Sequence, residues 1–449
     1  MTARNALSLQ NGIGTLEGKV SDVLRLAREL GASQAEASAS FGTGFSVNVR
    51  LREVETLRHQ RDQGLAVTVW LGHRKGSAST SDLRPEALEE SVRKACALAR
   101  HGAEDPASGL ADADRLARDV PELSLHHPWT IQPAAAIDLA LACEAAAFDA
   151  DPRVTNSEGA SVSTSEGLRV YGNSHGFLGG YSESDHSISC SVVATQDGAM
   201  ETDYEYAVAR DAADLLSPAE IGREAGRRTV ARLGGTKLST RTVPVLFPAR
   251  VARGLIGHLL SAISGGALYR KSSFLVDALG KPVFASCVTI DEQPHLPKAL
   301  GSAPFDNEGV ATTERRLVDA GVLRGYLLGS YYARKLGMQT TGNAGGAHNL
   351  VVQSTGQSFD ELLRTMGRGL VITDLMGSGV NPVTGDYSRG ASGFWVENGR
   401  IQHPVTEITI AGNLKEMYRQ ILGIGTDVDR RGGVLTGSIL VETMTVAGS

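Results

Sequence analysis

The sequence lacks the residue patterns that mark several common protein classes. Aromatic residues make up only 5% of its 449 residues. The four cysteines stand far apart and include no CxxC pair: Cys96, Cys143, Cys190 and Cys287. With no apolar secretion signal at the N-terminus, this spacing predicts reduced, buried thiols and a cytoplasmic location rather than a disulfide framework.

Other absences exclude nucleic-acid, membrane and nucleotide-binding classes. The formal net charge is −6, so the basic surface that bulk nucleic-acid binding requires is not expected. No apolar run approaches the ~20 residues that a membrane-spanning helix needs. There is no GxSxG, GxGxxG or GK[ST] motif, which weighs against a serine hydrolase, a dinucleotide fold and a P-loop enzyme.

What the sequence does contain is glycine (52 residues) and alternating apolar segments. Residues 45–53 and 65–71 alternate with period two, which predicts antiparallel strands, with "QRDQG" at 60–64 as the turn between them. Further strands are expected at "RGYLLGS", "GLVITDLMG" and the terminal "GSILVETMTVAGS". Helical spacing marks 85–100, 133–149, 217–233 and 358–367. The pattern predicts an α+β fold with mainly antiparallel sheets and flanking helices.

The chain is expected to divide into two domains. Residues 1–20 have no apolar core and are predicted to form a flexible tail, with Ser21 capping the first helix. An N-terminal α+β domain then spans 21–235 and a C-terminal α+β domain spans 236–449. The polar segment "TKLSTRTVP" at 236–244 is the predicted linker.

One predicted helix, "VARGLIGHLLSAISGG" at 251–266, resembles a zinc-protease helix with most of its functional residues missing. Such a helix supplies two histidines and a glutamate base, but only His258 is present here. Arg253 stands five residues before it and Gly254 four, and the segment contains no acid. A packed or hydrogen-bonded His258 is therefore favoured over a zinc ligand. A scattered site that adds other histidines stays open: His295, His348 and His403.

Three further segments are candidate contacts for a peptide or a partner. "GALYRKSS" offers Tyr269, Arg270 and Lys271, whose charges suit a carboxylate. "TGNAGGAHN" offers Asn343 and His348 between glycines that let another backbone approach closely. The glycine-rich stretch 376–393, predicted to be one long loop, offers Asp386, Tyr387 and Arg389. For each segment, an ordinary solvated turn or loop remains the alternative.

Long stretches of the chain resemble the PmbA, or TldE, branch of the TldD/PmbA family. They are "STSDL", "GLIGHLLSAISGGALYRKSSFL", "TTGNAGGAHN", "GSGVNPVTGDYSRGASGFWVENG", "ITIAGNLKEM" and "GSILVETMTVAG". The resemblance covers essentially the whole chain. It implies a subunit of a heteromeric zinc metalloprotease that matures peptides and degrades short unfolded polypeptides, including antitoxins.

The resemblance also implies which residues have been lost. The zinc site belongs to the TldD branch, as His-Glu-x-x-x-His on the helix and a cysteine near the C-terminus. These positions fall on Arg253, Gly254, His258 and Thr426, and no cysteine follows Cys287. The resemblance therefore implies no catalytic residue and no cofactor in this chain, with zinc held by a TldD-type partner.

The favoured hypothesis is a zinc-free subunit that forms a heterodimer with a TldD-type subunit and helps to enclose a chamber for unfolded peptides. A homodimer is expected to be possible in isolation. One alternative is that the chain is itself a metallopeptidase as a homodimer, using His258 with ligands from elsewhere. Another is a regulatory protein that modulates DNA gyrase or a toxin–antitoxin pair without any protease role.

Overall fold

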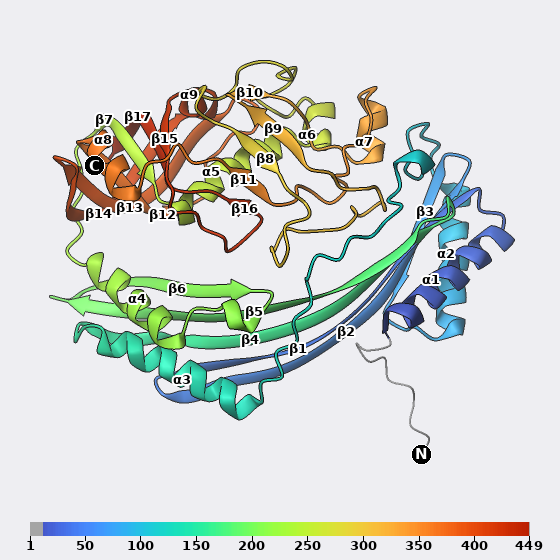
Figure 1. Ribbon diagram of the computed structural model, residues 1–449, viewed down its shortest axis with the longest axis horizontal. Coiled ribbons are helices and arrows are strands. Elements are labelled where there is room, and N and C mark those ends of the chain that lie inside the picture. The colour runs from blue at the N-terminus through green and yellow to red at the C-terminus, as the bar shows by residue number, and fades with distance from the viewer. Residues whose placement is uncertain (1–11, 449) are drawn as a thin grey trace.

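The computed structural model describes residues 12–448 and confirms the α+β class. Within this range the chain forms nine α-helices and three sheets. A long curved sheet lies along one side, and a compact half made of the remaining strands lies across its concave face (Figure 1). No helix in residues 12–448 is both long and apolar enough to span a membrane.

The first sheet contains six strands in the order β3-β2-β1-β4-β5-β6, and every neighbouring pair is antiparallel. The strands are β1 (Gln34–Arg50), β2 (Glu53–Leu71), β3 (Arg74–Thr80), β4 (Val154–Asn173), β5 (Leu178–Gln196) and β6 (Ala199–Ala209). Alternate side chains of a strand point to opposite faces. In β1, for example, Ala37 and Val47 are buried on one face, whereas Ser38 and Ser40 of the other face are exposed.

Four helices cover the apolar face of this sheet in two pairs: α1 (Gly12–Glu29) with α2 (Pro85–His101), and α3 (Pro133–Asp149) with α4 (Pro218–Ala231). The two pairs cover opposite ends of the sheet (Figure 1). Proline stands at the start of α2, α3 and α4, where its missing N–H has no cost. Because both pairs use the same face, the concave face stays free for the other half of the molecule.

Two predictions for this half are wrong. Residues 12–20 belong to α1, where Leu16 and Val20 are fully buried, so Ser21 does not cap the helix; residues 1–11 lie outside the described residues. "QRDQG" is not a turn, because β2 runs straight through it and the chain reverses at Leu51 and Arg52. The polar run was misleading because this part of β2 is exposed on both faces and shows no apolar alternation.

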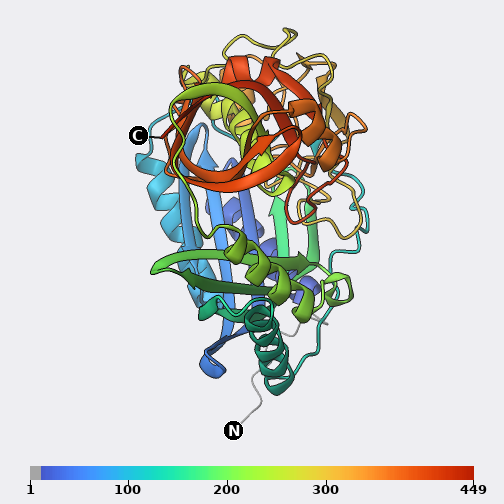
Figure 2. The same ribbon diagram turned by 90° about the vertical axis from the view of Figure 1, so that its left-hand side faces the viewer.

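The C-terminal half is built around a closed ring of five strands. β14 pairs with both β13 and β17, which closes the order β14-β13-β12-β7-β17, and β15 adds to β17 (Figure 2). The strands are β7 (Arg241–Phe247), β12 (Gly369–Met376), β13 (Asp386–Glu397), β14 (Arg400–Asn413), β15 (Ile421–Ile424) and β17 (Ile439–Ala447). Three helices flank the ring: α5 (Ala249–Ala262), α8 (Phe359–Met366) and α9 (Leu414–Arg419).

A smaller sheet of short strands completes this half, in the order β10-β9-β8-β11-β16. The strands are β8 (Ile290–Glu292), β9 (Arg315–Asp319), β10 (Val322–Leu323), β11 (Leu350–Val352) and β16 (Val434–Leu435), and two short helices lie nearby, α6 (Gly265–Tyr269) and α7 (Ser330–Lys335). The loops between these strands carry most of the glycine-rich segments that the sequence singles out.

Two predictions for the C-terminal half also need correction. The stretch 376–393 is not one long loop, because β12 ends at Met376 and β13 begins at Asp386. The segment "RGYLLGS" is not a strand, since β10 ends at Leu323 and α7 begins at Ser330. Its buried side chains, such as Leu328, pack into the main core instead, so apolar content there reflects burial rather than strand pairing.

Candidate functional site

Helix α5, which contains His258 and the predicted motif positions Arg253 and Gly254, is held by its apolar face. Leu255, Ile256 and Leu259 are buried in the main core of the C-terminal half. The hydroxyl of buried Tyr418 donates a hydrogen bond to the carbonyl of Leu255 at 2.9 Å. The helix is therefore a rigid element, and the positions on its other faces are presented at fixed orientations.

His258 lies on α5 against the start of β13. Its ring makes an edge-to-face contact with the ring of Tyr387, with centroids 5.9 Å apart. Burial lowers the pKa of His258 below its ordinary value of 6.5, and the nearby charge of Arg389 lowers it further. Tyr387 is itself buried, which raises its pKa to about 12. Two of the predicted contact residues, Tyr387 and Arg389, thus form the environment of His258, which is that of a neutral, packed histidine.

This environment predicts a pH dependence of stability. The folded pKa of His258 lies below its unfolded value, so the contribution is present above pH 6.5 and is lost as the pH falls through the folded pKa. We expect His258→Gln to reduce the loss of unfolding free energy between pH 7.5 and 5.5 by up to about 1 kcal/mol, measured by urea titration. The exposed His101→Gln serves as the control, and an equal pH slope in both variants would contradict the assignment.

Arg253, at the position of the first motif histidine, binds across the two halves of the molecule. Its guanidinium donates to the hydroxyl of Tyr206 on β6 at 2.8 Å and to the carbonyl of Arg431 at 3.0 Å. A permanently charged guanidinium does not ligate a cation. The side chain at this position is instead part of a contact between the curved sheet and the C-terminal half.

That contact is one member of a larger cluster, which we call the lobe clamp: Tyr204, Glu205, Tyr206, Arg250, Arg253, Asp429 and Arg431. Arg431 donates to both carboxylate oxygens of Asp429 at 3.0 Å and also bonds the carboxylate of Glu205. Arg250 donates to Glu205 at 3.2 Å and stacks 4.0 Å from the ring centroid of Tyr204. These bonds join β6 to α5 and to the loop before β16, so the clamp fixes the two halves relative to each other.

The remaining motif positions offer no metal ligand. Gly254 is exposed, and a Cβ built on it would have no atom within 4 Å. Thr426 is exposed. Its loop is linked to the start of α5 through Ser438, whose hydroxyl donates to the carboxylate of Asp427 and accepts from the backbone N–H of Ala249. One imidazole without a second histidine, carboxylate or thiolate does not fit a zinc site. Among residues 12–448 no group of three or more His, Cys, Asp or Glu is placed to hold a metal ion.

A groove of about 890 Å³ opens one turn beyond His258 on the same helix. Ser261, in the last turn of α5, and Ser264, just after the helix, form one wall. Helices α6 and α7 contribute others, and the loop 343–347 and Pro382 complete it. The structure therefore brings together all three of the segments that the sequence singled out. The lining includes five glycines, of which all but Gly265 have accessible backbone: Gly265, Gly266, Gly329, Gly345 and Gly346. The residues Tyr331 and Tyr332 also line it.

The cationic segment contributes unevenly to this groove. Arg270 is exposed and lines it, with its guanidinium 3.4 Å from the hydroxyl of Tyr332. Tyr269 is also exposed, but its ring packs against Tyr332 and under the ammonium of Lys335. Lys271 has a φ of 54° and ends the turn after α6. Arg270 is thus the charged side chain of this segment that the groove presents.

The loop with Asn343 and His348 is organised by a buried carboxylate that the sequence did not reveal. Glu292 is only 2% exposed and accepts from Asn343 Nδ2 at 2.7 Å and from the backbone of His348 at 2.8 Å. Its other oxygen accepts from Arg315 at 2.7 Å. Burial lowers the pKa of His348. Asn343 lines the groove, and His348 supports the same loop through its backbone bond to Glu292. Glu292 is the second of two acids at the end of the short strand β8, and nothing in the sequence singled it out.

Asp386 lies apart from the groove. It is exposed and accepts from Thr384 at 2.6 Å and Asn413 at 3.0 Å, and these bonds lower its pKa. They hold the tip of the β12–β13 connection, residues 377–385. From that connection Pro382 reaches the groove. Asp386 therefore supports the groove indirectly rather than lining it.

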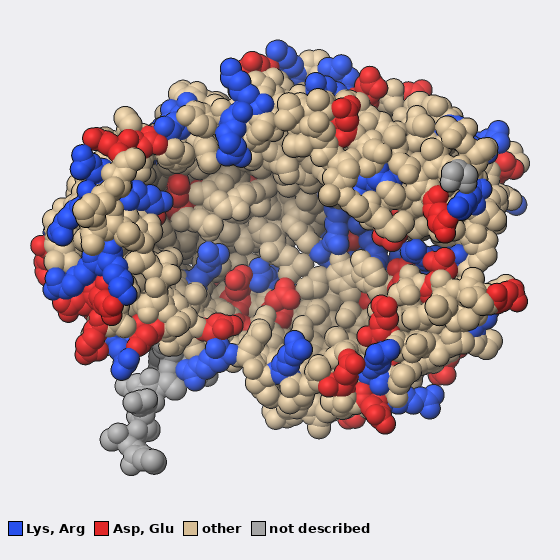
Figure 3. Space-filling view, turned by 180° about the vertical axis from the view of Figure 1, so that it is seen from behind, with Lys and Arg blue, Asp and Glu red and all other residues tan. Residues whose placement is uncertain are grey.

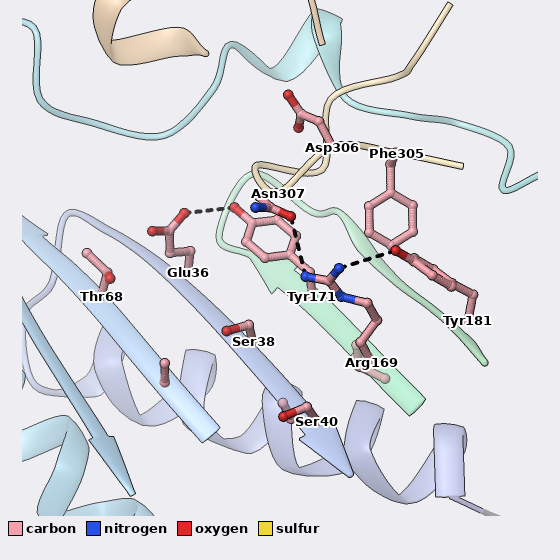
Figure 4. Close-up of a pocket in the computed structure, with 13 residues that line it drawn as sticks. Glu36, Ser38, Ser40, Thr68, Arg169, Tyr171, Tyr181, Phe305, Asp306 and Asn307 are labelled. Carbon is pink, nitrogen blue, oxygen red and sulfur yellow. Dashed lines mark hydrogen bonds between the residues drawn. The ribbon is translucent and has the colours of Figure 1, made fainter. Parts of the chain in front are cut away.

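A second cavity, of about 300 Å³, lies between the concave face of the curved sheet and the C-terminal half (Figure 4). The hydroxyl of Tyr171 donates to Glu36 at 2.8 Å, and Arg169 reaches across to the side-chain oxygen of Asn307 at 3.3 Å. Seen from behind, the molecule is hollowed between its two halves, with charged side chains in and around the recess (Figure 3). The floor of this recess carries polar side chains, with Ser38, Ser40 and Thr68 beside the larger Glu36 and Arg169.

Comparison with known proteins places this architecture in a family. Three models match in order: PmbA/TldA metallopeptidase domain 1 at residues 35–99, the central domain at 126–233 and the C-terminal domain at 240–448. Metalloprotease PmbA of Escherichia coli O157:H7 is 50% identical over 434 residues, covering 96% of each chain. The chain belongs to the PmbA/TldD metallopeptidase family.

Solved structures share the fold of this PmbA/TldD chain. A Bacteroides thetaiotaomicron VPI-5482 protein superposes with a TM-score of 0.93 at 27% identity, covering 99% of this chain and all of that one. TldE from Thermococcus kodakarensis superposes with a TM-score of 0.85 at 20% identity, covering 96% of this chain and 100% of that chain. The predicted linker at 236–244 overlaps the gap between the central and C-terminal family domains, and the curved sheet spans the first two domains.

Proposed function

We propose that this chain is the zinc-free, TldE-type subunit of a PmbA/TldD-family peptidase and pairs with a zinc-bearing TldD-type subunit. The observation that carries the proposal is the engagement of Arg253. At the position of a metal-binding histidine, its guanidinium is bonded to Tyr206 and to the carbonyl of Arg431. The neighbouring Gly254 has no side chain to act as a base.

The role of this chain is then to bind and position substrate. The groove beside α5 has the size of a ligand site and presents accessible backbone at Gly266, Gly329, Gly345 and Gly346, which suits an extended peptide that pairs through its main chain. Arg270 supplies a cation for a carboxylate of the peptide. The hydrolytic step is assigned to the partner, whose site would face the recess between the two halves of this chain.

The extended form of the substrate follows from the shape of the cavities. Strands and loops line both cavities, and neither forms a deep apolar pocket. The concave sheet face carries polar side chains such as Ser38, Ser40 and Thr68. Such a surface accommodates main chain with varied side chains, as degradation or maturation of unfolded peptides and turnover of antitoxins would require. A cytoplasmic location remains a prediction.

Metal content and cleavage test this function. We expect the purified chain to hold well below one zinc per molecule by mass spectrometry, and to leave an unfolded peptide intact after zinc is added. Adding the TldD-type subunit should produce metal-dependent cleavage, because a zinc site needs at least three protein ligands and no such group is placed together among residues 12–448. The TldD-type subunit alone is the control for activity that does not depend on pairing.

Other outcomes would favour the alternatives. About one tightly held zinc per chain, with cleavage lost in His258→Ala, would make the chain a metallopeptidase in its own right. Association with a gyrase or a toxin–antitoxin pair in place of a TldD-type subunit would support a regulatory role. Either result would overturn the zinc-free subunit.

A further inference from the structure

One edge of the curved sheet is open along the first part of β2. β2 pairs with β1 along its whole length, but on its other side it pairs with β3 only from Leu65, which lies opposite Thr80. From Thr56 to Gly64, no strand among residues 12–448 lies beside this outer edge. An open edge presents unpaired N–H and C=O groups, which natural proteins normally cover or blunt.

The open segment is also uncovered on its faces. From Glu53 to Gln63, every residue except Thr56 is exposed. The helices that cover the sheet pack elsewhere: α2 contacts the other end of β2, and α3 packs on β1 and β4. A strand that is exposed on both faces and along one edge gains little from its own fold, so its order must come from β1 and from the turn that precedes it.

That turn, at Leu51 and Arg52, has a strained backbone that a buried carboxylate stabilises. Leu51 and Arg52 both adopt positive φ, 51° and 66°, which is unfavourable for residues other than glycine. Glu144 on α3 is fully buried, and its carboxylate accepts from the backbone N–H of Leu51 at 2.9 Å and of Arg52 at 2.8 Å. A buried carboxylate thus holds the end of a hairpin whose second strand is here paired only with β1, which makes the open edge rigid.

We propose that a second copy of this chain docks on this edge, with its own β2 running antiparallel about a twofold axis at Gln60. We call the segment from Thr56 to Gly64 the open window. It ends at Leu65, where β3 begins to pair, and it begins after a bulge at Glu55, which has no partner in β1. A bulge bends its strand out of the ladder. Two windows centred on Gln60 overlap completely, and each bulge then lies where β3 of the other copy begins.

The charges along the window support this register. Residues that oppose each other across an antiparallel pair point to the same face, so a twofold pairing must be centred on a residue. With the axis at Gln60, Arg58 of each copy lies opposite Asp62 of the other copy. Both pairs lie on the concave face, where Gln60 and Asp62 line a cavity. Centring on Arg58 or on Arg61 would oppose two arginines instead. Like charges directly opposite each other are destabilising, and opposite charges stabilise.

The consequence is a continuous sheet of two curved halves, with the concave faces on the same side. This inference stands on the sheet edge and not on the zinc-free assignment. Its failure would leave the metal and cleavage experiments unaffected.

Charge reversal tests the pairing. We expect the full-length chain to sediment as a dimer at a concentration on the order of 100 µM. Arg58→Asp opposes like charges twice, and so does Asp62→Arg, so each should weaken self-association by about tenfold or more. A 1:1 mixture of the two variants should dimerise again, because every opposed pair is then of opposite sign. Arg223→Asp, on the exposed side of α4, is the matched control.

Three results would overturn the proposal. They are a monomeric wild-type chain, single variants that dimerise like the wild type, and variants whose mixture does not recover. If the wild-type chain is monomeric and Asp62→Arg blocks association with the TldD-type subunit, the edge belongs to that subunit and not to a second copy. Circular dichroism of each variant confirms that the fold is retained, since both side chains are exposed.

Discussion

Arg431→Ala is expected to lower the free energy of unfolding by about 3 kcal/mol, because it leaves two mostly buried carboxylates without their main partner. Asp429 and the side chain of Glu205 are each about a tenth exposed or less. Arg431 bonds both of them and also the carbonyl of Tyr206 at 3.0 Å. The loss should appear as earlier unfolding in calorimetry. It should also appear as faster proteolysis of the connection between α4 and β7, because that connection links the two halves that the lobe clamp holds together.

The neighbouring Arg430→Ala is the matched control. Arg430 is exposed, one residue away in the same loop, and its removal should change stability by less than about 0.5 kcal/mol. Equal effects of the two substitutions would show that the clamp does not hold the halves together. Unchanged proteolysis in Arg431→Ala would show the same.

Glu292→Ala is expected to cost about 3 to 5 kcal/mol, because it strands the guanidinium of Arg315 in a mostly buried site and removes the acceptor of Asn343. Glu292 bonds Arg315, Asn343 and the backbone of His348, so its loss should also loosen the groove wall. Urea unfolding measures the stability, and hydrogen exchange of the amides at 343–348 measures the order of the wall.

Asp291→Ala on the same strand provides the comparison. Asp291 pairs with Arg316, whose side chain is half exposed, so this substitution should cost less than about 1 kcal/mol. If Glu292→Ala were as mild as Asp291→Ala, the buried carboxylate would not organise the loop. Faster exchange confined to the wall, with global stability retained, would place its role in the groove alone.

Helices were the most predictable part of this fold. α4 begins after a capping box of Ser217 and Glu220, and α8 begins after one of Ser358 and Glu361. Such signals are local, since the cap bonds residues three apart, and the predicted ranges at 217–233 and 358–367 fall close to the observed helices. Strand ends were less predictable. The turn at Leu51 has no glycine or asparagine, and only Glu144, 92 or more residues away, explains it.

The candidate site likewise has one part that the sequence predicted and one part that it did not. The order of residues along the chain was enough to locate the helix with His258 and to see that its segment has no second histidine and no acid. The use that the molecule makes of Arg253 was not predictable, because Tyr206 and Arg431 are distant in sequence. The same holds for the groove, which three separate segments form together, and for Glu292, which looks like any acid in a short strand.

The sequence by itself determined the α+β class, the main helices and the fact that the segment 251–266 has His258 as its one histidine and contains no acid. Each of these depends on residue type and on spacing within one element, which the chain carries locally. Only the tertiary structure decided the closed ring of strands, the lobe clamp, the groove and the open edge of β2. These depend on which distant segments meet, and that is set by packing of whole faces and by the pairing of buried charges rather than by any local pattern.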